Sequence, residues 1–275
     1  MNASLSHAIA AVLNTADPRA KAMRTRAVVR DWRLGRLAWD FGCAMPERPV
    51  RPEKPELLPP GQMPKRGKGG SRAKRIALWH ALAHIEFVAI DLALDMAGRF
   101  GAEMEARFGH DVARGFVDDF LCVAADEAMH FAIIQRHLAS MGATYGDLPA
   151  HDGLWEAAGE TAHDLAARLA VVPMVLEARG LDVTPATIER VEASGDHRGA
   201  RILNRIFNDE IRHVRYGSEH FSRLAHQSGD SPDSLWKSLV TQYFRGKVKP
   251  PFNDSARQAA GLSRPAYLAL ACMGN

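Results

Sequence analysis

Cysteine, aromatic residues and net charge are all scarce in this sequence, and each scarcity excludes a class of protein. The 275 residues include 3 cysteines, at Cys43, Cys122 and Cys272. Their odd number and wide spacing support neither a disulfide framework nor a cysteine-based zinc site, and they fit a reducing cytoplasm. Aromatic residues make up 7% of the chain, and 35 basic side chains are nearly balanced by 32 acidic ones. This is not a nucleic-acid-binding composition, although local basic patches stay open.

Long apolar runs and strand-like alternation are missing as well. The N-terminal apolar stretch is too short and interrupted for a secretory signal, and no later run reaches about 18 apolar residues. We therefore expect a cytoplasmic protein with no membrane-spanning segment. The hydrophobic content of 47% and the length of 275 residues suffice for one main domain with extensions.

Apolar residues recur at helical spacing along most of the chain, which predicts an all-α protein. We expect helices over residues 4–14 and 18–40, followed by a proline- and glycine-rich loop or arm over 46–70. The basic part of this arm, from Lys65 to Arg75, is compatible with phosphate contacts, but a solvated basic linker is the commoner explanation of such a composition.

Four longer amphipathic stretches follow, and they predict a four-helix bundle. We expect these helices from Ser71 to the glycines at 98 and 101, from about 111 to 141, from about 154 to 179 with a kink at Pro173, and from about 196 to 226. A short helix over 185–193 would bridge the last two. The predicted organisation is an N-terminal helical extension with the basic arm (1–70), the bundle (71–228) and a C-terminal helical extension that packs on the bundle (229–275).

The pattern Asp-Glu-x-x-His occurs twice, and it is the strongest functional feature of the sequence. Glu127 and His130 belong to the second long helix, and Glu210 and His213 to the fourth, 83 residues further on. Residues at i and i+3 lie on one face of a helix, so each pair can present a carboxylate oxygen and an imidazole nitrogen to the same point. Two such faces can hold two metal ions.

The other two long helices each offer one glutamate on their apolar stripe, Glu86 and Glu177. Two-metal sites in helical bundles use one further glutamate from each of the two remaining helices. Four buried carboxylates without a counter-charge would be prohibitive, whereas two divalent cations balance them. Oxygen and imidazole ligands suit iron or manganese, and zinc stays open. The predicted metal ligands are Glu86, Glu127, His130, Glu177, Glu210 and His213.

Other acidic and histidine residues lie outside this ligand set. Asp126 and Asp209 precede the two motif glutamates, and we expect Asp126 to support His213 and Asp209 to support His130, because ligand histidines usually donate their second N–H to a carboxylate. A third Glu-x-x-His, Glu160 to His163, lies about 21 Å before Glu177 along a continuous helix and is excluded. Residues outside the ligand set are assigned to structural or packing roles: His80, His84, Tyr216, Trp79, Met129 and Met174.

Several segments are similar to an uncharacterised bacterial family within the ferritin-like superfamily. They are HALAHIEFVAIDLALD, DEAMHFAIIQRHL, YGDLPAHDGLWE, VPMVLEARGLDVTP and DEIRHVRYG, and the resemblance covers roughly residues 32–261. It implies a ferritin-like four-helix bundle whose di-metal ligand positions are occupied by the six residues named above. It implies no settled substrate, because the family is named for its domain rather than for an activity.

The expected function is that of a di-iron or di-manganese oxidoreductase that activates O₂ or peroxide, a hydroxylase or oxidase of an unidentified substrate. A small molecule is one candidate substrate, and a tRNA-type substrate is another by analogy with a tRNA-modifying hydroxylase of similar bundle. The alternatives are an iron-handling ferroxidase or peroxide-detoxifying protein and a metal-stabilised binding protein. The electron donor and a homodimer stay open.

Overall fold

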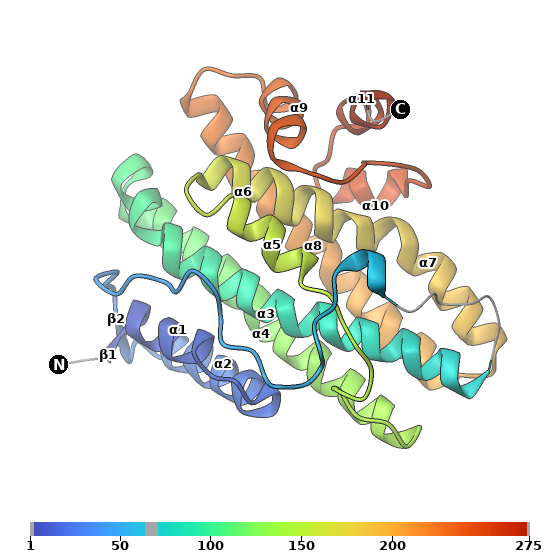
Figure 1. Cartoon of the computed structure of the whole chain (residues 1–275). Helices are drawn as coiled ribbons and strands as arrows, with labels where there is room; N and C mark the ends of the chain where they lie inside the picture. The colour runs from blue at the N-terminus through green and yellow to red at the C-terminus, as the bar shows by residue number, and fades with distance from the viewer. Residues whose placement is uncertain (1–2, 64–70, 274–275) are drawn as a thin grey trace. The chain divides into compact units, whose positions relative to one another are not determined.

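The computed structural model describes residues 3–63 and 71–273, and it is built almost wholly of α-helices (Figure 1). The chain divides into two compact units, residues 1–155 and 156–275. The all-α prediction is therefore confirmed, and each unit is described by itself. The predicted division at residues 70 and 228 stays a prediction.

The first unit begins with two helices that are capped as their sequences require. Helix α1 (Leu5–Leu13) is capped by Ser4, and α2 (Pro18–Arg33) by Asp17, whose side chain accepts a hydrogen bond from the Ala20 N–H. The prediction of helix over 18–40 is wrong beyond Arg33. Gly35 adopts φ +66°, and the chain then forms the short strand β2 (Leu37–Ala38), which pairs in parallel with β1 (Ala3–Ser4).

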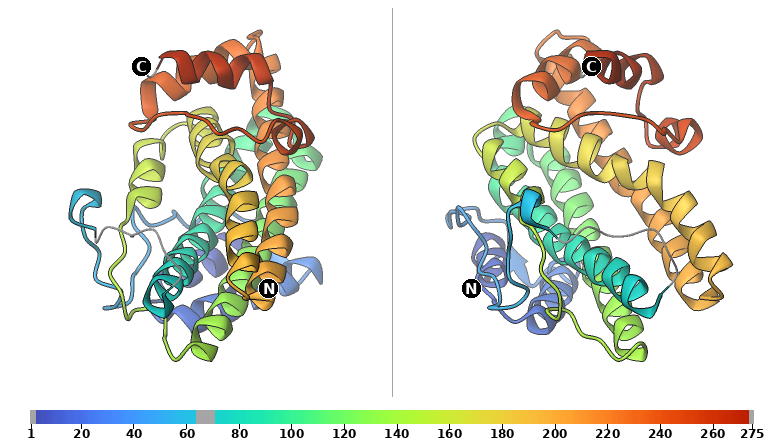
Figure 2. Two further views of the ribbon diagram at one scale, coloured as in Figure 1. Left: turned by 90° about the vertical axis from the view of Figure 1, so that its right-hand side faces the viewer. Right: turned by 45° about the vertical axis from the view of Figure 1, so that its right-hand side comes forward.

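Helices α3 (Arg72–Phe108) and α4 (His110–Ser140) form a long hairpin at the centre of this unit, and they run side by side in every view (Figures 1 and 2). Gly109, at φ +82°, is the single connecting residue. The prediction that α3 ends at Gly98 to Gly101 is wrong. A Cβ at Gly98 would collide with Met45 and one at Gly101 with Phe41, so these glycines admit a neighbouring segment rather than ending the helix.

That neighbouring segment, which we call the strap (residues 41–63), lies along the first unit in extended form and ends in the turn η1 (Pro60–Gln62). It is fastened by a buried charge cluster in which Asp91 of α3 binds Lys21 of α2, at 2.6 Å, and Arg51 of the strap. The strap is therefore part of the folded unit. Of the basic stretch from Lys65 to Arg75, residues 65–70 lie outside the described part of the chain, and α3 begins at Arg72.

The second unit departs from the prediction of one helix over 154–179 and a separate short helix over 185–193. The chain breaks after α5 (Gly153–Glu160) and resumes with Asp164 as an N-cap. Beyond Pro173 it continues through Gly180 without ending. The elements in chain order are α6 (Leu165–Val171), the π-helical segment η2 (Val172–Glu177), α7 (Ala178–Ala193) and α8 (His197–Gln227).

The C-terminal tail forms the smaller helices that the sequence predicts, and they pack within the second unit. Trp236 donates its indole N–H to the Ala170 carbonyl at 3.0 Å, and Ser218 donates to the Ala260 carbonyl at 2.6 Å. Both bonds join the tail to the long helices. The tail helices are α9 (Pro232–Tyr243), α10 (Asp254–Ala259) and α11 (Arg264–Met273).

By length and composition α3 is apolar enough to cross a membrane, but 67% of its most apolar window is buried inside the protein. Residues Glu86 to Gly98 are buried without interruption, including the charged side chains of Asp91 and Asp95. These are properties of the central helix of a water-soluble fold.

Candidate metal centre

Glu86 projects from the part of α3 that is buried all round. Its exposed fraction is 4%, and its neighbours Phe87 and Ile90 are fully buried. A carboxylate in such surroundings is costly unless charged or hydrogen-bonding groups compensate it. The apolar stripe that placed Glu86 in the core is therefore confirmed, and the residue has to be explained by what surrounds it.

Helix α4 brings Glu127 and His130 against Glu86. The Nδ1 atom of His130 lies 3.2 Å from a Glu86 oxygen and 3.4 Å from a Glu127 oxygen. The ligand atoms of all three residues lie within 4.8 Å of one another, and Glu127 and His130 are 1% and 0% exposed. The first unit thus holds a compact, buried acidic and histidine cluster.

The spacing of these atoms matches donors that share one cation. With metal–ligand bonds of about 2.1 Å, adjacent donors stand roughly 3.0 Å apart in octahedral and roughly 3.4 Å apart in tetrahedral coordination. The two separations at His130 Nδ1, 3.2 and 3.4 Å, lie within that interval. The cluster can therefore hold a metal ion with little rearrangement.

The electrostatics of this cluster also favour a bound cation. Burial, and next the negative charge of Glu127, raise the pKa of Glu86 well above its usual value, while the hydrogen bond from His130 opposes the shift. Two carboxylates this close and this buried cannot both remain ionised without positive charge between them. A divalent cation would supply that charge.

In the second unit, α8 presents the other copy of the motif. His213 Nδ1 lies 3.8 Å from a Glu210 oxygen, and the His213 side chain is fully buried while that of Glu210 is 13% exposed. The i, i+3 spacing therefore brings this pair together on one helix face, as predicted.

Glu177 occupies the last position of η2, a π-helical irregularity of the backbone. The sequence predicts only a kink there. Pro173 has no N–H to donate, and the chain there adopts the wider π-helical turn. Against it lies Gly217 of α8, where any Cβ would overlap the Pro173 ring. Short π-helical segments occur frequently at functional sites because they turn a side chain away from the regular helix face. The proline inside an amphipathic helix was the available signal.

The two aspartates that precede the motif glutamates are half-buried, and the structure shows neighbours for each within its own unit. Asp126 accepts a weak contact from Cys122 Sγ at 3.9 Å. Asp209 accepts a hydrogen bond from Arg212 at 3.3 Å and faces Arg205 at 3.8 Å. The predicted pairing of Asp126 with His213 and of Asp209 with His130 stays a prediction.

His80 and His84 have structural partners in the loop after α4. His80 Nε2 accepts the backbone N–H of Gly146 at 2.9 Å. His84 Nε2 lies 3.0 Å from the His151 carbonyl and must donate to it, so its Nδ1 accepts the Tyr145 hydroxyl at 2.8 Å. The ring of His84 is therefore neutral when both bonds are made.

We expect His84 to make stability depend on pH. Burial lowers the pKa of His84 from 6.5 to about 4. Since the unfolded chain binds the proton first, stability is unaffected above about pH 6.5 and falls by on the order of 3 kcal/mol as the pH approaches about 4. Urea unfolding in the presence of a chelator, at a series of pH values, measures this slope. His84→Gln keeps the donor to the His151 carbonyl and should flatten the slope, and an unchanged slope would contradict the assignment.

The remaining candidates take structural or surface roles. The third Glu-x-x-His does not lie on a continuous helix, because the chain turns between Glu160 and Asp164, and His163 instead lies 3.3 Å from the Tyr243 hydroxyl. The predicted distance of about 21 Å assumed a continuous helix, and that assumption is wrong. Glu160 ends α5, and His163 lies in the turn that follows. Trp79 and Met174 are buried in the core, as expected, while Met129 and Tyr216 are half-buried.

Comparison with known proteins identifies relatives of this chain but assigns no activity to them. A family model described as a protein of unknown function, DUF455, matches residues 14–268. An uncharacterized protein of Haemophilus influenzae is 42% identical over 227 residues, which cover 82% of this chain and 78% of that protein. No solved structure matches the chain.

Proposed function

Because this chain belongs to the DUF455 family of proteins of unknown function, its activity has to be inferred from its own residues, and we propose that it is a di-iron or di-manganese carboxylate oxidoreductase. The observation that carries the proposal is the buried cluster of Glu86, Glu127 and His130, whose donor atoms have the spacing of ligands that share one cation. In a metal-free core, the free-energy cost of burying these two carboxylates would not be compensated.

The proposal includes a second group of ligands, formed by Glu177, Glu210 and His213. Its support is the repetition of Glu-x-x-His and the ordered placement of one further glutamate before each copy. One half-set offers two carboxylates and an imidazole, and so does the other. Together they carry four negative charges, which two divalent cations would neutralise. A ferritin-like four-helix bundle is the arrangement in which this order of ligands recurs, and we propose it for this chain.

Iron is the preferred metal of the proposal, with manganese second. The ligand set combines hard carboxylate oxygens with imidazole and contains no thiolate. Two ferrous ions held in such a set would supply two electrons, enough to reduce O₂ to peroxide or peroxide to water, and an external electron donor would return them to the ferrous state. The side chains of the chain hold the ions and keep the site dry, since Glu127 and His130 are 1% and 0% exposed.

Oxygen consumption tests this function directly. The protein is loaded with iron, reduced without oxygen and then exposed to O₂, while absorbance and dissolved oxygen are followed. We expect about two metal ions per chain and O₂ uptake that requires bound iron. Repeated turnover of added Fe(II) without an organic substrate would instead indicate a ferroxidase. A reduced, iron-loaded protein that never consumes O₂ would refute the oxidoreductase and leave a metal-stabilised binding protein.

A further inference from the structure

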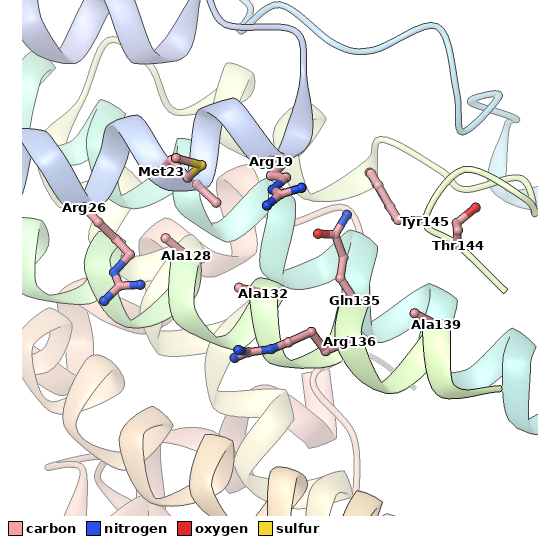
Figure 3. Close-up of a pocket in the computed structure, with 11 residues that line it drawn as sticks. Arg19, Met23, Arg26, Ala128, Ala132, Gln135, Arg136, Ala139, Thr144 and Tyr145 are labelled. Carbon is pink, nitrogen blue, oxygen red and sulfur yellow. The ribbon is translucent and has the colours of Figure 1, made fainter. Parts of the chain in front are cut away.

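A groove between α2 and α4 carries positive charge that the metal centre does not use. It is a cavity of about 550 Å³ in the first unit, and Figure 3 shows Arg19, Met23 and Arg26 reaching into it from α2 and Gln135 and Arg136 from α4. No acidic side chain is among the described residues that line it. The volume is that of a small-molecule site.

The three arginines of this groove have no acidic partner in the described part of the chain. Among the residues that the structure describes, none of the three makes an ion pair or a hydrogen bond. Their neighbours on the same surface behave differently, since Arg24 donates to Thr15 at 2.9 Å, and Arg30 and Arg36 both bind Asp31. Unpaired arginines occur elsewhere in the described chain too, Arg33 and Arg223 among them, but this groove brings three unpaired guanidinium groups to one cavity. They are Arg19, Arg26 and Arg136.

The positions of these arginines suit an extended anion with an apolar part. Arg19 and Arg26 lie seven residues apart on one face of α2, about 10.5 Å along its axis. Between them on the same face stands Met23, which is 64% exposed. Small residues of α4, Ala128 and Ala132, form the opposite wall and leave the space open. Guanidinium groups at both ends and an apolar middle favour a phosphate ester over a bare ion.

This groove is distinct from the metal cluster. Along α4, Ala128, Ala132 and Gln135 recur at helical spacing and define the face that looks toward α2. At 100° per residue, Glu127 lies roughly 105° and His130 roughly 165° away from this face around the same helix. A ligand in the groove therefore does not touch the metal ligands, and it is not the molecule that the centre oxidises.

We propose that the groove between α2 and α4 binds a small organic phosphate carrying two or more negative charges. The phosphate oxygens accept hydrogen bonds from Arg26 and Arg136, Arg19 contacts a second phosphate or another polar group of the ligand, and the body of the ligand covers Met23. The proposal stands independently of the metal chemistry, because every residue that carries it lies outside the predicted ligand set.

Calorimetric titration of the full chain with inorganic pyrophosphate and with adenosine monophosphate tests the groove. We expect both probes to bind, and the double variant Arg26→Gln/Arg136→Gln to raise the Kd of each at least about tenfold, because charge-assisted hydrogen bonds are lost. The variant Met23→Ala should weaken adenosine monophosphate and leave pyrophosphate unchanged. Metal content and thermal stability should match the parent protein in both variants.

The matched control is Arg33→Gln/Arg223→Gln, which removes two exposed arginines, from α2 and α8, that do not line the groove. Equal weakening in this control would show a general charge effect and overturn the proposal, as would a Kd above about 10 mM for both probes. A short RNA duplex serves as the third probe. Duplex binding that depends on Arg26 and Arg136 while neither small phosphate binds would also overturn it, in favour of a nucleic-acid surface.

Discussion

Replacement of Glu127 and Glu210 by alanine together is expected to abolish metal binding. Each carboxylate accompanies a histidine on its own helix, at 3.4 Å for Glu127 and 3.8 Å for Glu210, so the double variant removes one carboxylate from each half-set. We expect the metal content to fall from about two ions per chain to on the order of a tenth, with loss of O₂ consumption. Elemental analysis after dialysis measures the first effect and an oxygen electrode the second.

The single variants add a test of whether the two half-sets form one site. If Glu127 and Glu210 bind the same pair of ions, each single variant should lose nearly as much metal as the double variant, because residues of one network do not contribute additively. The control is Glu160→Ala/Glu219→Ala, two acidic residues whose side chains are 52% and 61% exposed. Full retention of both ions by Glu127→Ala/Glu210→Ala would refute the centre itself.

The second large effect is expected from a single methyl group. The Cβ introduced by Gly217→Ala would overlap the Pro173 ring, where η2 packs against α8. Because both segments are buried, the clash can be relieved only by separating them, at a cost of about 1–3 kcal/mol. We expect the melting temperature to fall by roughly 3–10 °C and metal content to fall with it, since Glu177 ends the displaced segment.

Gly180→Ala is the matched control for this substitution. Gly180 also lies in a helix, in α7, and no atom lies within 4 Å of the position of its missing Cβ. Alanine there should stabilise the helix by up to about 1 kcal/mol, the ordinary difference in helix propensity. If Gly217→Ala and Gly180→Ala have the same effect on thermal unfolding, the close approach at Pro173 does not constrain the fold.

The predictable part of this molecule is the part that helical periodicity governs. The i, i+3 spacing of Glu127 and His130, and the apolar stripe under Glu86, were sufficient to foresee that the three meet in a core. The helix over about 111–141 was placed within a residue at each end, because Gly142 at φ +69° stops it and the pattern before it is regular.

Two differences between the predicted and observed helices have their physical origin in glycine and proline. Gly98 and Gly101 were read as a break, but in the fold they admit Met45 and Phe41 of a distant segment, and sequence spacing does not reveal such a partner. Pro173 predicts a kink, whereas the chain there forms a π-helical segment, and Gly217 of α8 leaves room for the proline ring. The unpaired arginines of the groove also depend on which acids lie nearby in space. These features are tertiary, and local patterns do not encode them.

The burial of α3 bears on how the chain is made. Its most apolar window would suffice to cross a membrane, yet α1, α2 and the strap cover it in the finished unit, with Asp91 bound to Lys21 and Arg51. These three segments precede α3 in the sequence and have left the ribosome before it, whereas α4, which packs along α3, follows it. Residues 5–63 are thereby made in time to cover part of the apolar surface of α3 before α4 follows, at the stage when exposed apolar surface promotes aggregation.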